Sequence, residues 1–277
     1  MKTVTLPEDE TIAALGQGTW YVGDDPAMRE REIEALNRGI DLGMTVIDTA
    51  EMYGSGRSET RVGEAIAGRR DEVFLVSKVL PGNASRKGTI AACEASLKRL
   101  GTDRIDLYLL HWRGGVPLGE TVAAFEALVK EGKIRHWGVS NFDVNDMEEL
   151  FSVPGGAKVA ANQVLYNLTR RGIEWDLADW CASRGIPVMA YSPVEQARLL
   201  RHPDLRELAA GLGITAAQLA LAWVLRRRDT MAIPKASSPS HVADNAAAAE
   251  ITLNDETLQA LDRMFAPPRK ATPLEML

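Results

Sequence analysis

Four polar side chains in the first half of the chain could together act on a carbonyl group. Asp48 and Tyr53 lie close together in sequence, whereas Lys78 and His111 each follow a later apolar run. Tyrosine is a weak acid with a pKa of about 10, but a neighbouring ammonium favours the phenolate. We therefore expect Lys78 to lower the pKa of Tyr53, with Asp48 keeping Lys78 charged and in place. These three residues could give a proton to a carbonyl oxygen that His111 orients by hydrogen bonding.

Each of these side chains also has an ordinary explanation when it is taken alone. An Asp after a strand is commonly a turn residue or a helix cap, and a Lys or His there can simply be solvated. A shared site is nevertheless favoured, because every predicted strand ends in a polar or aromatic residue. These strand-end residues are Thr19, Trp20, Asp48, Lys78, His111, Ser140, Asn141, Gln163, Tyr191, Ser192 and Lys235.

The elements that must position these residues alternate along the chain. Apolar stripes at helical spacing, such as Ile33, Leu36 and Ile40, run into glycines that suit helix C-termini. These glycines are Gly43, Gly68, Gly101, Gly132, Gly156 and Gly185. Each is followed by a short apolar run that is typical of a parallel strand covered on both faces. With a weak first run and a last one added, the predicted strands are 14–18, 44–47, 73–76, 105–110, 134–139, 159–161, 188–190 and 230–233.

Eight strand–helix units without a break in composition predict a single (β/α)8 TIM barrel over residues 1–277. Residues 4–6 and 11–13 could form a β-hairpin before the repeats, and 205–210 and 258–265 are typical of two extra helices. The same pattern leaves an open, doubly wound sheet as the alternative. In a barrel the carboxyl ends of the strands meet at one face, where such enzymes have their active sites.

An anion-binding position is predicted where the last strand runs into the last repeat helix. Ser238 is a good N-cap and Pro239 a good first helical residue. The N–H groups of such a helix start attract phosphate, and Lys235 and Ser237 lie beside it in sequence.

Composition excludes several classes of partner. The chain has 277 residues, with 32 Lys and Arg against 38 Asp and Glu, and its formal net charge is −6. This balance argues against nucleic acid and anionic membranes as partners. No apolar stretch is long enough to span a membrane, and the acidic start lacks the apolar region of a signal peptide. We therefore expect a cytoplasmic protein.

The sequence gives little support to other kinds of catalytic site. His111 is the only histidine at a predicted strand end, so we expect no metal site. No G-x-S-x-G segment supplies a serine nucleophile, although a Schiff base on Lys78 stays open. Gly16 and Gly18 lack the third glycine of a Rossmann fingerprint, so any dinucleotide would bind without that fold.

The sequence resembles the aldo-keto reductases over nearly its whole length. The segments that carry this resemblance are 46–54, 62–65, 77–78, 106–112, 132–142, 162–164, 190–193 and 233–237. Residues 16–21 and 51–53 are most similar to the short bacterial methylglyoxal-reductase type. The resemblance implies a catalytic tetrad of Asp48, Tyr53, Lys78 and His111, with NADPH as the hydride donor.

The resemblance also implies which residues bind the cofactor and the substrate. Tyr191 would stack on the nicotinamide, Ser192 would lie beside the pyrophosphate, and Asn245 would lie near the adenine. The full cofactor set is Gly18, Thr19, Trp20, Asp48, Ser140, Asn141, Gln163, Tyr191, Ser192, Pro193, Val194, Ile233, Pro234, Lys235, Ala236, Ser237, His241 and Asn245. The substrate set is Trp20, Tyr53, Leu80, His111 and Trp112.

Four departures from the family pattern refine these expectations. His241 stands where many relatives have an arginine near the adenosine phosphate, so we expect NADPH with weaker use of NADH. Arg113 stands where proline is usual, and its guanidinium could favour anionic or hydrated carbonyls. Leu80 lies in a segment without the tryptophan of many relatives, and the tail after Phe265 is short. We therefore expect an open substrate pocket.

The resulting hypothesis is NADPH-dependent reduction of small aldehydes, ketoaldehydes and α-dicarbonyls, with methylglyoxal as the leading substrate. One alternative on the same fold is an NADP(H)-binding redox sensor or subunit, and another is a diketo-sugar-acid reductase. A Schiff-base aldolase that uses Lys78 is a third alternative. We expect the protein to be a monomer.

Overall fold

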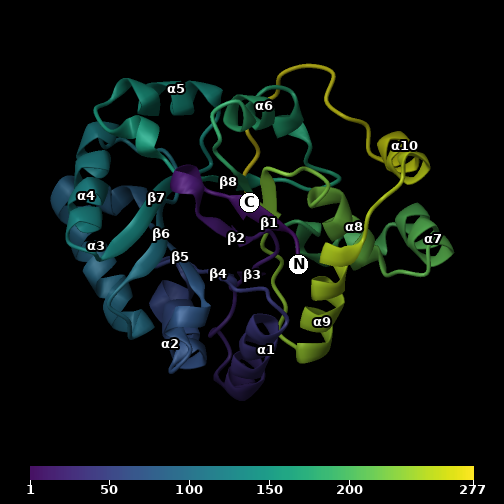
Figure 1. Cartoon of the computed structure of the whole chain (residues 1–277), viewed down its shortest axis with the longest axis horizontal. Coiled ribbons are helices and arrows are strands. Elements are labelled where there is room, and N and C mark those ends of the chain that lie inside the picture. The colour runs from purple at the N-terminus through teal and green to yellow at the C-terminus, as the bar shows by residue number, and fades with distance from the viewer.

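The computed structural model describes residues 1–277, apart from the side chain of Glu8. Eight parallel strands follow one another around the molecule in chain order, and helices surround them (Figure 1). The strands are β3 (Gln17–Gly18), β4 (Val46–Asp48), β5 (Phe74–Val79), β6 (Ile105–Leu110), β7 (Ile134–Ser140), β8 (Asn162–Leu165), β9 (Val188–Tyr191) and β10 (Thr230–Ala232). The predicted barrel is confirmed.

Backbone hydrogen bonds join the first and last strands and close the barrel. Leu15 pairs with Ala232 in a parallel bridge. The Gly16 N–H donates to the Ala232 carbonyl over 2.8 Å, and the Gly18 N–H donates to the Pro234 carbonyl over 3.0 Å. Closure rules out the open, doubly wound sheet, and it brings the two ends of the sheet together beside the predicted site.

Ten α-helices surround the strands. They are α1 (Arg29–Asp41), α2 (Arg57–Ile66), α3 (Arg86–Leu100), α4 (Leu118–Lys130), α5 (Val144–Ser152), α6 (Leu177–Ala182), α7 (Pro203–Gly211), α8 (Ala216–Val224), α9 (Pro239–Ala247) and α10 (Asp255–Met264). The two predicted extra helices correspond to α7 and α10. Among the described residues no single helix has the length and composition of a membrane span. The pair α7 and α8 passes that test together, but it is bent by 89°.

The predicted hairpin covers the amino-terminal end of the barrel. Strands β1 (Thr3–Thr5) and β2 (Thr11–Ala13) are antiparallel and lie across the barrel centre in Figure 1. Glu10, just before β2, pairs with Arg135 over 2.7 Å and with His136 over 2.6 Å. These contacts fasten the hairpin to β7 at the end of the barrel opposite the predicted site.

Two strands were predicted to end three or more residues too early, and both errors come from buried polar side chains. The predicted strand at 159–161 ends where β8 begins, and β5 runs on past residue 76. Asn162, Gln163 and Lys78 therefore lie inside strands rather than after them. Each is nearly fully buried, and each has hydrogen-bond partners. Since apolar runs predict only apolar strand residues, satisfied polar ones were missed.

One of the predicted glycine helix ends, Gly156, is wrong. The φ angle of Gly101, the C-cap of α3, is +63°, as a left-handed helix end requires. The helix α5 ends at Ser152 with Val153 as an extended C-cap, and Gly155, with φ of +82°, precedes a short 3-10 helix that starts at Gly156.

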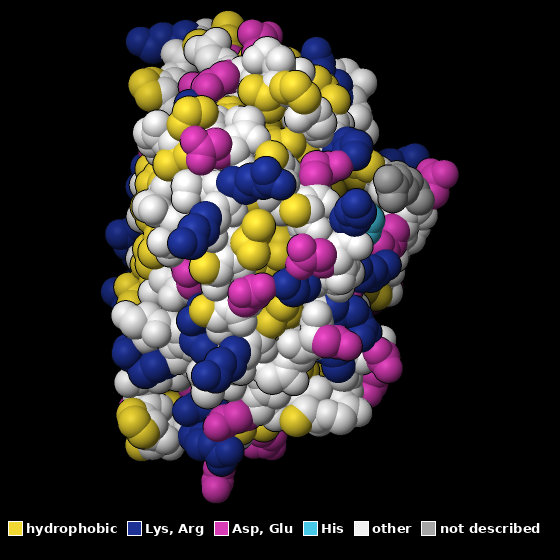
Figure 2. All heavy atoms as spheres, turned by 90° about the vertical axis from the view of Figure 1, so that its left-hand side faces the viewer, with side chains coloured by type: hydrophobic (Ala, Val, Ile, Leu, Met, Phe, Trp, Pro, Cys, Tyr) yellow, Lys and Arg dark blue, Asp and Glu magenta, His cyan; other side chains and the backbone are white. Residues whose placement is uncertain are grey.

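Charges of both signs are interspersed on the side of the molecule that carries α3 and α4. Figure 2 shows basic, acidic and apolar side chains mixed on this face, with neither sign of charge gathered into a large patch. Polyanion-binding surfaces need such a gathering of basic residues, and this face has none among its described residues.

Candidate active site

Asp48 and Lys78 form a buried ion pair at the carboxyl ends of two neighbouring strands. Asp48 ends β4, and Lys78 is the penultimate residue of β5. The Lys78 Nζ lies 2.8 Å and 2.9 Å from the two Asp48 carboxylate oxygens and 2.8 Å from the Thr49 carbonyl oxygen. It also lies 3.2 Å from the hydroxyl oxygen of Tyr53. The structure thus brings together the three residues of the predicted proton relay.

This contact pattern leaves the proton of Tyr53 free for another partner. An ammonium has three protons to donate. Around Lys78 they find the Asp48 carboxylate, the Thr49 carbonyl and the Tyr53 oxygen as acceptors. Because Tyr53 accepts in this contact, its own O–H can donate to a group in the cavity above it.

The predicted direction of the pKa shift of Tyr53 is wrong. Burial raises its pKa well above the ordinary value, and the negative charge of Asp48 raises it further. The prediction counted the effect of the Lys78 charge on Tyr53, but neither burial nor the direct effect of the Asp48 charge. Burial also lowers the pKa of Lys78, and the charge and hydrogen bonds of Asp48 oppose this effect. Tyr53 is therefore a protonated phenol at neutral pH, which is the form that a proton donor needs.

His111 is a neutral imidazole whose tautomer follows from its surroundings. Burial, with the charge of Lys78 as a second cause, lowers its pKa to about 3. Its Nδ1 is buried and has no hydrogen-bond partner among the described residues. A buried N–H without an acceptor is the less favourable state, so we assign the single proton to Nε2. The ring stands edge-on to Tyr53, with 5.9 Å between the ring centroids.

Buried hydroxyl groups hold the end of β4, which carries Asp48, in place. The Thr19 hydroxyl donates to the Asp48 carbonyl over 2.8 Å. The Ser58 hydroxyl lies 2.7 Å from that of Thr19, and the Thr49 hydroxyl lies 3.0 Å from that of Ser58. All of these hydroxyl groups are inaccessible to solvent, so the network fixes β4 against the start of α2.

A cavity of about 640 Å³ opens beside Asp48 and Tyr53. Fourteen of the predicted cofactor residues line it: Gly18, Thr19, Trp20, Asp48, Tyr191, Ser192, Pro193, Val194, Ile233, Pro234, Lys235, Ala236, His241 and Asn245. Predicted residues that do not line it are Lys78, Ser140, Asn141, Gln163, Ser237, Leu80, His111 and Trp112. The cavity runs from the tetrad to the start of α9, where the Ser238 hydroxyl accepts from the His241 N–H over 3.4 Å.

The predicted amide-binding residues form one cluster next to the tetrad. The Gln163 amide donates to Asp48 over 2.8 Å, and the Ser140 hydroxyl donates to the Gln163 carbonyl over 2.8 Å. The Asn141 amide donates to Ser140, and the Tyr191 hydroxyl donates to the Asn141 side-chain oxygen. These polar groups lie between the Asp48 carboxylate and the aromatic ring of Tyr191.

Comparison with known proteins places this geometry in a family. The model of the aldo/keto reductase family matches residues 14–265. The chain belongs to the aldo-keto reductase family. It is 52% identical to a protein named methylglyoxal reductase YeaE from Escherichia coli, with 100% of this chain and 99% of the relative covered.

Further relatives bear on the cofactor. An aldo-keto reductase from Klebsiella pneumoniae, solved in complex with NADPH, is 53% identical and superimposes with a TM-score of 0.98 over 100% of this chain and 99% of its own. A second Escherichia coli relative is named NADH-specific methylglyoxal reductase, and it is 31% identical over 95% of this chain and 100% of its own length.

Two aromatic side chains of this aldo-keto reductase stand at the mouth of the cavity. Trp20 stacks on Tyr21, with ring centroids 4.9 Å apart, and lies 6.3 Å from Tyr53. Tyr21 is 55% exposed and was not predicted. Two signals could have identified it: its aromatic side chain next to Trp20, and its place in the segment 16–21 that carries the family resemblance. Other lining residues that were missed are Gln196, Ala197, Leu200, Thr215, Ala216, Ala217 and Asp244.

Arg113 does not serve the cavity as the sequence suggested. Its guanidinium pairs with Glu149 over 2.8 Å and donates to the Val116 carbonyl over 3.0 Å. It is not among the residues that line the cavity. Because an acid already neutralises it, Arg113 offers no free charge to an anionic substrate.

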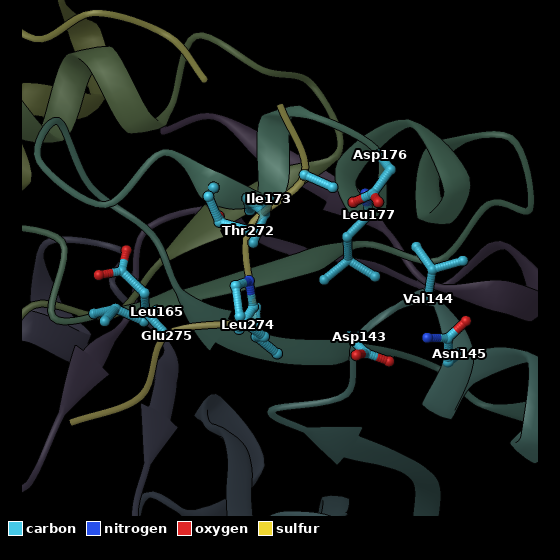
Figure 3. A pocket seen from close by; sticks show the side chains of 13 residues that line it. Asp143, Val144, Asn145, Leu165, Ile173, Asp176, Leu177, Thr272, Leu274 and Glu275 are labelled. Carbon is cyan, nitrogen blue, oxygen red and sulfur yellow. The ribbon is translucent and has the colours of Figure 1, made fainter. Parts of the chain in front are cut away.

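The tail after α10 reaches the site despite its short length. Burial raises the pKa of Tyr191 to about 12, and a backbone hydrogen bond from Leu277 opposes this effect. The tail also covers a second cavity of about 430 Å³. Figure 3 shows its residues Leu274 and Glu275 on one side and Asp143 and Asp176 on the other. Asp143 and Asp176 cap α5 and α6, so this second cavity has no cluster of free acids there.

Proposed function

We propose that this chain reduces small aldehydes and α-dicarbonyls with NADPH, and that methylglyoxal is the leading substrate. The observation that carries the proposal is the contact between the buried Lys78–Asp48 pair and Tyr53 at the edge of the main cavity. The high identity to a relative named methylglyoxal reductase supports the choice of substrate. The neutralised Arg113 gives a diketo-sugar-acid substrate no support.

The residues of the cavity fit a nicotinamide dinucleotide phosphate. Its tetrad end offers the aromatic ring of Tyr191, and its far end offers Lys235 near the amino terminus of α9. A helix start beside a cation suits a phosphate group. When bound, NADPH supplies a hydride to the carbonyl carbon.

The residues of this chain would orient the substrate carbonyl and donate a proton to its oxygen. The Nε2–H of His111 would donate to the carbonyl oxygen and hold it near Tyr53. The Tyr53 hydroxyl would then give its proton to that oxygen, which becomes an alcohol. The resulting phenolate would be stabilised by the ammonium of Lys78, already 3.2 Å away. Asp48 would keep that ammonium charged and oriented.

Cofactor choice is part of the same proposal. Lys235 and His241 line the far end of the cavity, and an imidazole holds a phosphate less firmly than an arginine does. We therefore propose NADPH as the preferred cofactor with weaker use of NADH.

The experiment is loss of NADPH absorbance when methylglyoxal is added to the purified protein. The proposal expects turnover with methylglyoxal and other small aldehydes. Binding of NADPH without turnover across a broad carbonyl panel would contradict it and favour a redox sensor. Covalent trapping of a carbonyl substrate on Lys78 by borohydride would instead favour the aldolase.

A further inference from the structure

One wall of the main cavity is a segment with an unfavourable backbone. We name residues 192–201, which follow β9, the strap. The φ angles of Ser192, Glu195, Gln196 and Ala197 are +47°, +50°, +52° and +65°. Left-handed backbone is unfavourable for residues that carry a Cβ. The strap can keep this shape only if its contacts compensate for the strain.

A single buried carboxylate supplies the main contacts. Glu195 is 5% exposed. One of its oxygens accepts from the Asn167 side-chain amide over 2.8 Å. The other accepts from Arg170 over 3.1 Å and from Arg198 over 2.8 Å. Burial raises the pKa of Glu195, but the hydrogen bonds from Asn167 and Arg170 outweigh this and lower it overall. Glu195 is thus a charged anchor.

Two of the residues that hold Glu195, Asn167 and Arg170, lie between β8 and α6, whereas Arg198 belongs to the strap itself. Asn167 is fully buried, and its side-chain oxygen accepts from the backbone N–H groups of Thr169 and Arg170 over 2.9 Å and 3.1 Å. Its amide also donates to the Ser192 carbonyl over 2.9 Å. Asn167 therefore binds the strap by hydrogen bonds at two points, at Ser192 and at Glu195.

The strap presents its other residues to the cavity. Its lining residues are Ser192, Pro193, Val194, Gln196, Ala197 and Leu200. Glu195 is not among them, so its side chain fastens the strap from behind while its neighbours form the wall. Lys235, His241 and Asp244 also line this cavity.

We infer that Glu195 is a positioning residue that holds the strap over the cavity and thereby slows the release of the dinucleotide. This inference rests on the proposed function, because it concerns the same cavity. Glu195 contacts neither the tetrad nor the cavity, so its loss would act on release and leave the chemical step intact.

The test is the rate of NADP⁺ release from Glu195→Gln, measured by stopped-flow protein fluorescence. The amide keeps the size of the side chain and removes the charge that holds Arg170 and Arg198. We expect release about tenfold faster or more, since losing one partner of a buried charge pair acts mainly on dissociation. Hydrogen exchange of residues 192–201 in the cofactor-free protein should also become faster.

Glu174→Gln is the matched control. Glu174 is another carboxylate held by two arginines, Arg171 over 2.7 Å and Arg226 over 2.8 Å, with its side chain only 10% exposed, and it does not line the cavity. Its loss should lower stability but leave NADP⁺ release and strap exchange at wild-type rates.

Three results would overturn the inference. The first is a Glu195→Gln variant in which both NADP⁺ release and hydrogen exchange of the strap stay at wild-type rates. The second is an equal acceleration of NADP⁺ release in Glu195→Gln and Glu174→Gln, which would indicate general destabilisation. A wild type that binds neither NADP⁺ nor NAD⁺ would overturn the proposed function and the retention role together. Strap exchange in the free protein would then still show whether Glu195 fastens the strap.

Discussion

At the scale of single residues, the sequence predicted the members of the tetrad but not their ionisation. Residue types and strand-end spacing were enough to bring Asp48, Lys78 and Tyr53 together, and the structure places them in contact. The direction of the Tyr53 pKa shift depends on burial and on the charge of Asp48. Neither can be read from a linear pattern, because both depend on how the strands close around the site.

The lowered pKa of His111 predicts a specific loss of stability in acid. Its pKa falls from 6.5 to about 3 on folding, so between these pH values the unfolded chain binds a proton that the folded chain does not. Stability from this residue is therefore lost as pH falls through that window. The unfolding free energy of each protein can be compared at pH 7 and pH 4. We expect the drop between these pH values to be about 3 kcal/mol smaller in His111→Gln than in the wild type.

Denaturant unfolding at the two pH values measures this difference. His241→Gln removes an exposed imidazole and should keep the pH dependence of the wild type. An identical pH dependence in His111→Gln and in the wild type would show that His111 does not carry this effect.

At the scale of elements, the alternation of strands and helices was predictable, whereas the strap was not. The hairpin and both extra helices were found because apolar periodicity marks them. The strap has no periodicity, and its left-handed residues include Glu195 and Gln196, types that carry no turn signal. Its fastening to Asn167 joins segments 28 residues apart, which local pattern cannot reveal.

Gly18 lies where the first and last strands of the barrel meet, so a methyl group added there should disturb the closure of the sheet. A Cβ on Gly18 would lie 2.6 Å from the Ile233 carbonyl oxygen, so β3 and the segment after β10 would have to separate. We expect Gly18→Ala to lower the unfolding free energy by about 2 kcal/mol and to weaken NADPH binding, because Gly18 and Ile233 both line the cavity.

Gly119→Ala, in the first turn of α4, is the comparison for Gly18→Ala. Nothing lies within 4 Å of its added Cβ, and stability should stay the same or rise by up to about 1 kcal/mol. Equal denaturation midpoints for the two variants would refute the role of close strand approach at Gly18.

At the scale of the whole molecule, the sequence predicted one barrel, and the described chain forms one closed sheet. The net charge of −6 argued against large polyanions, but net charge says nothing about the local anion position predicted at Lys235 and the start of α9. Which strand-end side chains face the cavity needed the structure, because only closure fixes their directions.

We expect the protein to sediment as a monomer of about 30.2 kDa. The tetrad and the lining of the main cavity come from one chain, so no second copy is needed to complete the site. Analytical ultracentrifugation at micromolar concentration measures this directly. A stable dimer at that concentration would contradict the expectation.

Cofactor selectivity should respond to the residue at position 241. His241→Arg would supply a planar, permanently charged partner for the adenosine phosphate. The ratio of kcat/KM for NADPH over NADH should rise about tenfold. In His241→Gln the ratio should not rise, and a similar rise in both variants would argue against a charge effect at this position.

Single-turnover reduction of methylglyoxal by Tyr53→Phe tests whether Tyr53 gives the proton to the carbonyl oxygen. Phenylalanine keeps the ring beside Trp20 and His111 and removes only the hydroxyl that contacts Lys78. We predict that reduction of methylglyoxal slows by about a thousandfold while the Kd for NADPH stays within about twofold. Reduction by this variant at a near-normal rate would show that Tyr53 is not the proton donor.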